Sequence, residues 1–255
     1  MNKLIINDLT IKYSENVILD NCSCEISSND VVLIDGKNGT GKSTLIKTIL
    51  GIDRNTRNVT GNISFTKIDK NILEMNDSEL LDYRSQIAYL EQKDYYDNNP
   101  FETVFDVLSD SYKDYYKKTK LSVADKNAIE EIFDKFKPEN SKFTLKTKVS
   151  KLSGGQQRLL SIIASICIRS NSKLFIIDEP LNNLDVNTVV KVSNILNKII
   201  KENNDAMFII VSHCKIFPFI TKKLEIRDNK LVVSNKTVCH TCYGEPDKNG
   251  YYEVW

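Results

Sequence analysis

Short runs of apolar residues, separated by polar turns, are the main pattern along this chain. Runs of four or five apolar residues are typical of strands buried in a sheet, and apolar residues at every third or fourth position are typical of helices. The runs predict strands at 4–13, 17–19, 31–34, 62–65, 86–90, 174–177, 208–211, 222–227 and 230–233. The helical repeat is clearest at 45–50, 76–83, 104–108, 129–136 and 159–168. This alternation of strands and helices predicts an α/β fold.

The polar stretch 54–61 is interpreted as a turn. The segment 93–149 differs from the rest, because it combines helix-period apolar residues with tyrosine pairs and many lysines. We expect it to form a mainly helical lobe inserted into the sheet domain, since strands precede and follow it.

Composition and charge exclude several classes of protein. With 255 residues, 41% of them hydrophobic, the chain can bury the core of one large domain. A net charge of +1 gives no general attraction to nucleic acid or anionic lipid. The apolar runs are far shorter than the ~20 residues of a membrane helix, and the polar pair Asn7-Asp8 follows the start too early for a signal peptide. We therefore expect a cytosolic protein without a membrane span.

The six cysteines do not have the spacing of a secreted disulfide framework. Cys22, Cys24 and Cys167 lie in apolar patterns and are expected to be packing residues. Near the end, the sequence Cys239-His240-Thr241-Cys242 could supply three zinc ligands or belong to a short packed extension. We favour the extension, because structural zinc usually has four ligands.

One stretch carries a specific chemical signature: GKNGTGKST at residues 36–44 matches the phosphate-binding pattern G-x-x-x-x-G-K-[S/T]. Its glycines let the backbone approach phosphate oxygens, and the N–H groups at the start of the following helix attract them. Lys42 is expected to reach the β- and γ-phosphates, and the Ser43 hydroxyl to bind Mg²⁺. The candidate nucleotide-binding residues of this loop are Gly36, Asn38, Gly39, Thr40, Gly41, Lys42, Ser43 and Thr44.

Other positions fit nucleotide chemistry as well. Tyr13, at the end of the first strand, could stack on adenine or could simply cap a strand edge. The sequence Ser-Gly-Gly-Gln at 153–156 stands where a helix N-cap belongs and would make a second anion site. The strand 174–177 ends in Asp178-Glu179, and α/β proteins bind ligands at the carboxyl ends of their parallel strands.

Together these motifs resemble the nucleotide-binding subunit of ATP-binding-cassette (ABC) proteins, over about residues 1–235. They follow the family's order: Tyr13, the loop 36–44, Gln92, the signature Leu-Ser-Gly-Gly-Gln at 152–156, Asp178-Glu179, Asp185 and His213. The resemblance implies a P-loop NTPase core with a mixed, RecA-like sheet, an N-terminal antiparallel β region and an inserted α-helical lobe. It divides a single ABC ATPase domain into a nucleotide-binding core at 1–92 and 174–235, a helical lobe with the signature at 93–173, and a C-terminal extension at 236–255.

The resemblance also implies an Mg²⁺-dependent ATPase with assigned roles. Glu179 would polarise the attacking water as general base. Gln92 would sense the γ-phosphate, Mg²⁺ and water, and His213 would contact the γ-phosphate. Asp185 occupies the D-loop position, which faces the dimer interface in this family. The implied catalytic residues are Glu179, His213, Gln92 and Asp185, and the implied metal-binding residues are Ser43, Gln92 and Asp178.

A dimer and a membrane partner follow from the same resemblance. In this family the signature contacts the γ-phosphate held by the other subunit, and this chain has one loop and one signature. The signature residues implied to bind the partner's ATP are Ser153, Gly154, Gly155 and Gln156. The second cassette would be another copy or a homologous one. A transmembrane permease subunit is expected to dock near Gln92 and the lobe, where Tyr95, Tyr96 and Phe101 offer aromatic anchors, and would hold the protein at the inner face of the cell membrane.

Two alternatives from other classes remain open. A soluble, ribosome- or nucleic-acid-associated ABC ATPase would fit the sequence Asn-Asn-Leu-Asp at 182–185, which is somewhat similar to the translation-factor branch of the family. The single cassette and the near-neutral charge argue against it. A nucleotide-binding scaffold without turnover is disfavoured, because Lys42, Glu179 and His213 are all present.

Overall fold

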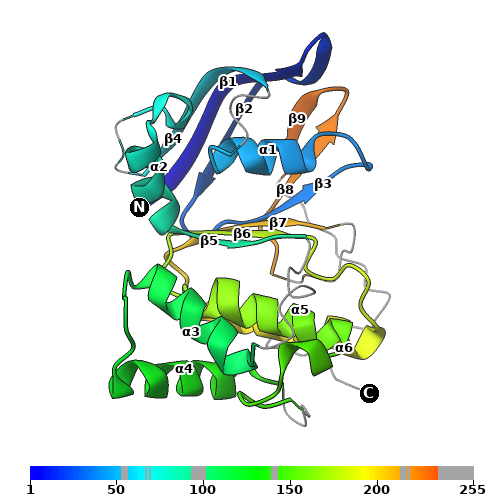
Figure 1. The fold of residues 1–255 in the computed structure, drawn as a ribbon. Helices are drawn as coiled ribbons and strands as arrows, with labels where there is room; N and C mark the ends of the chain where they lie inside the picture. Colours follow the sequence, from blue (N-terminus) through cyan, green and yellow to red (C-terminus); the bar gives the residue numbers. More distant parts are fainter. Residues whose placement is uncertain are drawn as a thin grey trace.

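The fold is described from a computed structural model, which places residues 1–52, 57–66, 68, 70–92, 102–138, 143–212, 217 and 219–234. Within these residues the chain forms two sheets with helices packed on both faces of the larger one (Figure 1). The α/β fold expected from the sequence is confirmed, including its antiparallel N-terminal region.

The smaller sheet is antiparallel and has the strand order β2-β1-β4. Its strands are β1 (Lys3–Tyr13), β2 (Asn16–Ser27) and β4 (Asn58–Phe65). In β1 the buried residues Leu4, Ile6, Leu9 and Ile11 follow a two-residue period that an irregularity between Ile6 and Leu9 shifts by one residue. One face of this sheet therefore faces the core, as alternation predicts.

The larger sheet has the order β5-β6-β7-β3-β8-β9 among the described residues. Neighbouring strands are parallel except for the antiparallel hairpin of β8 and β9. Its strands are β3 (Val31–Asp35), β5 (Ile87–Leu90), β6 (Leu174–Asp178), β7 (Met207–Val211), β8 (Lys222–Arg227) and β9 (Lys230–Ser234). Parallel strands β3, β5, β6 and β7 thus bring their carboxyl ends to one edge, where α/β proteins place ligands.

Two hydrophobic clusters fill the two faces of this sheet. One contains α1 (Lys42–Ile49), α2 (Asp77–Ser85), the short 3₁₀ helix η2 (Ile72–Glu74) and the antiparallel sheet. On the other side lie α3 (Val104–Tyr115), α4 (Val123–Phe136), the 3₁₀ helix η3 (Val149–Lys151), α5 (Gly154–Ile162), the π-helix η4 (Ile163–Cys167) and α6 (Val186–Glu202) (Figure 1). In β6, Ile176 faces the first cluster and Ile177 the second.

The lobe helices are therefore not a separate core. Val104, Ile129 and Leu160 share one hydrophobic cluster with α6 and with one face of the large sheet. Among the described residues no helix combines the length and the apolar character needed to cross a bilayer.

Three sequence interpretations need correction. The turn expected at 54–61 is wrong for 58–61, which form the first half of β4 by pairing their backbone with β1. Those residues are mostly exposed, so they need no apolar side chains to be a strand. The segment 17–27 is one continuous strand. Helix α6 was not predicted, although Val189, Leu196 and Ile199 are buried at helical spacing.

Candidate functional site

The phosphate-binding loop connects β3 to α1 as the sequence predicts. Gly41 has φ 103°, a backbone conformation that residues with a Cβ rarely adopt, and a Cβ there would collide with the side chain of Ile18. Gly39 has φ 80° with open space beside it. Since Gly41 provides no side-chain cap, the first N–H groups of α1 keep their capacity to bind an anion.

Lys42 is held over this loop by backbone carbonyls. Its side chain is buried, and Nζ donates hydrogen bonds to the carbonyl oxygens of Gly36 at 2.7 Å and Lys37 at 3.1 Å. The Thr40 hydroxyl donates to the same Lys37 oxygen at 2.9 Å. The positive charge is thus placed at the loop before any phosphate binds, with partners that an anion can replace.

A cavity of about 420 Å³ brings this loop together with two other predicted motifs. It is lined by Ile18, Asn38, Gly39, Gly41, Lys42, Ser43, Thr44, Gln92, Asp178, Glu179, Asn182 and Val211. Gln92 comes from the end of β5, and Asp178 and Glu179 from the end of β6. Lys42 and Glu179, which are 137 positions apart along the chain (179 − 42), therefore share one cavity, because the carboxyl ends of β3, β5 and β6 meet at one edge of the sheet.

Asp178 is the buried acid of the cavity. It is 4% exposed, and within the described residues its Oδ1 has no hydrogen-bond partner. Burial, reinforced by the neighbouring Glu179, raises the pKa of the Asp178 carboxyl to about 6. A buried carboxylate oxygen without a partner fits a cation ligand, and Mg²⁺ takes few protein oxygens of this kind. Asp178 and the Ser43 hydroxyl, which lines the same cavity, would hold the ion.

Glu179 is held in an unusual backbone conformation. It is 9% exposed, and its φ of 46° lies in the left-handed region, which non-glycine residues seldom adopt. Its N–H donates to the carbonyl oxygen of Val211 at 2.8 Å, which fixes the turn after β6 against the end of β7. Such local strain clusters at functional sites.

Several predicted site residues lie elsewhere. Tyr13, at the end of β1, is 37% exposed and is not among the residues that line the cavity. Gly36 and Thr40 belong to the loop without lining the cavity. Asp185 caps α6: its carboxylate accepts from the Thr188 N–H at 3.1 Å and the Thr188 hydroxyl at 2.6 Å. This contact lowers the pKa of Asp185.

The signature segment also lies outside the cavity of the single chain. Ser153 and Gln156 form a capping box at the start of α5, in which the Gln156 side chain accepts from the Ser153 N–H at 2.9 Å. Gly154 is exposed, and a Cβ there would meet no atom within 4 Å. His213 and the segments with Tyr95, Tyr96, Phe101 and Cys239 lie outside the described residues.

The sequence did not identify Ile18, Asn182 and Val211 as cavity residues. Asn182 had a usable signal in the sequence, because it stands only three residues after Glu179. In the structure its N–H donates to the Glu179 carbonyl at 3.3 Å. Ile18 and Val211 are ordinary strand residues, so only the tertiary fold brings them to the cavity.

Comparison with known proteins identifies the family. The family model described as ABC transporter matches residues 19–182. This chain belongs to the ABC transporter family. It is 34% identical over 217 residues to a probable ABC transporter ATP-binding protein, p29, of Mesomycoplasma hyorhinis, covering 84% of this chain and 82% of the relative. It is 28% identical to the zinc import ATP-binding protein ZnuC of Wolbachia pipientis, covering 96% and 84% of the two chains.

A third relative and a solved structure extend the similarity. The lipoprotein-releasing system ATP-binding protein LolD of Wigglesworthia glossinidia brevipalpis is 26% identical, over 92% of this chain and all of the relative. The fold matches a dimeric, post-hydrolysis ATP-binding cassette bound to ADP and phosphate, with a TM-score of 0.72 at 21% identity, over 92% of this chain and 99% of that one. As a member of this family the chain is an ATP-binding, ATP-hydrolysing subunit that uses Mg²⁺.

The raised pKa of Asp178 has a measurable consequence for the nucleotide-free protein. The pKa of Asp178 is about 6 in the folded protein and ordinarily 3.8, so the protonated carboxyl favours the folded state. Its contribution to the free energy of unfolding is complete below about pH 4 and is lost as the pH rises through 6. We expect Asp178→Asn to be more stable than wild type at about pH 7.5, by roughly 1–3 kcal/mol, with no difference near pH 4.

Urea unfolding between pH 4 and pH 8 without nucleotide measures this difference. The same variant is expected to lose the stabilisation that Mg²⁺ with ATP gives the wild type, which is followed by the melting temperature. A difference between the two proteins that is independent of pH would contradict the burial of an ionisable group at this position.

Proposed function

We propose that this chain is the ATPase subunit of a membrane transporter, and that two copies, or one copy and a homologous cassette, close around two ATP molecules to drive a transmembrane partner. One observation carries the proposal. The loop and the acidic pair share a cavity, whereas the signature segment 153–156 lies outside it at the exposed start of its own helix. A helix N-terminus that is suited to an anion, but does not line the chain's own nucleotide cavity, supports a composite site between two subunits.

Within the composite site each side chain has a role that fits its surroundings. Glu179, at the cavity wall, accepts a proton from the attacking water. Lys42 exchanges its carbonyl partners for phosphate oxygens. Asp178 and Ser43, together with Gln92, would hold Mg²⁺, which would supply positive charge against the phosphates. The loop residues Gly36, Asn38, Gly39, Thr40, Gly41 and Thr44 wrap the phosphates through their backbone.

The remaining predicted residues complete this proposal. Tyr13 is exposed enough to stack on adenine, and His213 would contact the γ-phosphate. Ser153, Gly154, Gly155 and Gln156 would bind the partner's γ-phosphate. Asp185 would act at the interface through the start of α6. The nucleotide-binding core would comprise residues 1–92 and 174–235, the helical lobe residues 93–173 and the C-terminal extension residues 236–255. The protein would be cytoplasmic, and its transmembrane partner would attach it to the inner face of the membrane.

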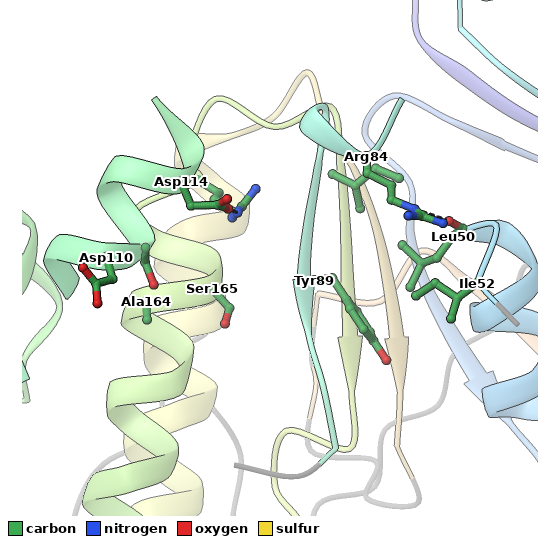
Figure 2. Close-up of a pocket in the computed structure, with 11 residues that line it drawn as sticks. Leu50, Ile52, Arg84, Tyr89, Asp110, Asp114, Ala164 and Ser165 are labelled. Atoms are coloured by element: carbon green, nitrogen blue, oxygen red, sulfur yellow. Dashed lines mark hydrogen bonds and ion pairs between the residues drawn. The ribbon is translucent and has the colours of Figure 1, made fainter. Parts of the chain in front are cut away.

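A groove beside the lobe offers a docking place for that partner. Its volume is about 530 Å³, and it is lined by Leu50, Ile52, Arg84, Ile87, Tyr89, Asp110, Ser111, Asp114, Ala164, Ser165 and Arg169. Figure 2 shows Tyr89 of β5 between α3 and η4 on one side and the end of α1 on the other. Tyr89 precedes Gln92 by three residues, so the groove adjoins the strand that enters the catalytic cavity.

The lining favours a short amphipathic helix from a transmembrane subunit. Leu50, Ile52 and Tyr89 give an apolar floor, while Asp110 and Asp114 from α3 lie in ion pairs with Lys113 and Arg169. Arg84 donates to the backbone carbonyls of Leu50 and Gly51, so its charge is partly used inside the protein. A helix with an apolar face complements such a groove. The relatives named for zinc import and for lipoprotein release are similar to this chain over most of its length.

The general-base role predicts a specific kinetic effect. Glu179→Gln is expected to retain ATP affinity and to lose turnover by ~10²–10⁴-fold, because the amide cannot accept the proton from water. Steady-state phosphate release and nucleotide titration measure the two quantities. Glu130→Gln, an exposed acid on α4, is the matched control. Turnover of Glu179→Gln close to wild type would remove Glu179 from this role.

The composite site predicts an effect of Gly154 on assembly. In the single chain Gly154→Ala meets no steric obstacle and should stabilise α5 by roughly 0.5–1 kcal/mol. In the dimer the added methyl group lies where the partner's phosphate approaches, so the ATP-dependent dimer of the Glu179→Gln protein should weaken. Light scattering with ATP and with ADP measures the mass.

Gly155→Ala is the steric comparison, since its Cβ would lie 3.0 Å from the Thr188 hydroxyl and should lower monomer stability. An ATP-dependent dimer that forms equally well with Gly154→Ala would count against the composite site.

The groove predicts a change in membrane recruitment. Ser165→Tyr fills the groove and is expected to release the protein from membranes of cells that express its native neighbours, because the docking helix loses its space. Val123→Tyr, at an exposed position of α4, is the control for an added surface aromatic. Cell fractionation of the wild type and both variants measures how much of each protein is bound to membranes. Wild-type protein found with ribosomes or nucleic acid, and none with membranes, would favour the soluble alternative.

A further inference from the structure

Arg158 is a buried arginine that makes hydrogen bonds to backbone carbonyls at the ends of two strands. It lies in α5, two residues after the signature, and is 3% exposed. Its Nη1 donates to the Glu91 carbonyl at 2.8 Å. Its Nη2 donates to the carbonyls of Asp178 at 3.0 Å and Glu179 at 2.9 Å, and its Nε donates to that of Pro180 at 3.2 Å. Among the described residues, one guanidinium therefore binds four main-chain oxygens.

Three of these oxygens surround the strained turn at Glu179. The left-handed φ of 46° persists only where neighbouring groups over-determine it. Arg158 binds the carbonyls of residues 178, 179 and 180, and the Val211 carbonyl accepts the Glu179 N–H on the other side. The direction of the Glu179 side chain follows from its backbone, so these contacts aim the acid into the cavity.

The fourth oxygen belongs to Glu91, directly before Gln92. Strands β5 and β6 are parallel neighbours, with Leu90 opposite Ile177, so their ends lie side by side. Arg158 connects them beyond the last paired residues. We propose that Arg158 is a positioning residue for ATP hydrolysis, which fixes the backbone of Glu179 and of Gln92 relative to each other. This inference rests on the proposed role of Glu179 as general base.

The location of Arg158 gives this contact a further consequence. Helix α5 begins at the exposed segment 153–156, which receives the partner's phosphate in the proposed dimer. A small shift of that helix end displaces the guanidinium and with it the turn at Glu179. A lysine could not substitute, because an ammonium group lacks the planar set of donors that reaches four carbonyls.

The test compares wild type, Arg158→Lys, Glu179→Gln and the double variant. Arg158→Lys is expected to lower kcat about 10- to 100-fold, with nucleotide affinity and KM unchanged, since small misplacements of a catalytic group have effects of this size. In the Glu179→Gln background the same change should have no further effect on the residual turnover, because the base through which Arg158 acts is already absent.

Two further measurements separate positioning from general destabilisation. Hydrogen exchange of the Glu179 amide should accelerate in Arg158→Lys. Tyr83→Phe is the matched control: it removes another buried hydrogen bond to a backbone carbonyl, from the Tyr83 hydroxyl to Ile49 at 2.8 Å, and should lower the melting temperature while kcat stays unchanged. If Arg158→Lys does not fold, two other variants take its place in the test. These are Arg158→Gln, and Arg158→Ala measured with added guanidinium.

The outcomes are distinguishable. Glu179→Gln with near-normal turnover would contradict the proposed function itself. If Glu179→Gln is inactive while Arg158→Lys turns over ATP within about twofold of the wild-type rate, only the inference on Arg158 is overturned. Independent, multiplicative losses in the double variant would also overturn it, as would failure of all three Arg158 variants to fold, since that would make the residue purely structural.

Discussion

The removal of two adjacent carboxyl groups from water is the constraint on which this structure depends. Asp178 ends β6, a strand whose residues are all buried, and Glu179 follows it. The fold supports this pair at a cost, visible in the raised pKa of Asp178 and the left-handed backbone of Glu179. Groups with perturbed pKa values and strained backbone are common where chemistry is done. The strand ends, Lys42 and Arg158 all supply polar or positive partners around this pair.

Much of the fold followed from local patterns. The loop at 36–44 has a spacing that fixes both its shape and its neighbours, so its strand and helix were predicted correctly. The first half of β4 could not be found, because exposed strand residues pair through their backbone and leave no apolar signal. Helix α6 had a signal in the helical spacing of its apolar residues Val189, Leu196 and Ile199. Its N-cap Asp185 was singled out as a D-loop residue and not as the start of a helix.

The site was predictable to the extent that its residues stand in recognisable motifs. Lys42, Asp178 and Glu179 met in one cavity as expected, whereas Ile18 and Val211 join them only through tertiary packing. Arg158 illustrates the same limit. A charged residue on a helix is usually a solvated one, and nothing in its sequence position indicates that it is buried against four carbonyls. That the signature does not line the cavity is likewise visible only in the folded chain.

The central claim, a catalytic site completed by a second chain, is tested most directly by mixing two defective variants. Lys42→Ala removes the loop charge and keeps the signature, while Ser153→Arg blocks the signature and keeps the loop. Each alone should be inactive, and their mixture should regain ATP hydrolysis, most strongly at equal amounts, because only the mixed dimer contains one intact loop facing one intact signature. If both variants are folded and no mixture recovers activity, or if Ser153→Arg alone hydrolyses ATP normally, the composite site is contradicted.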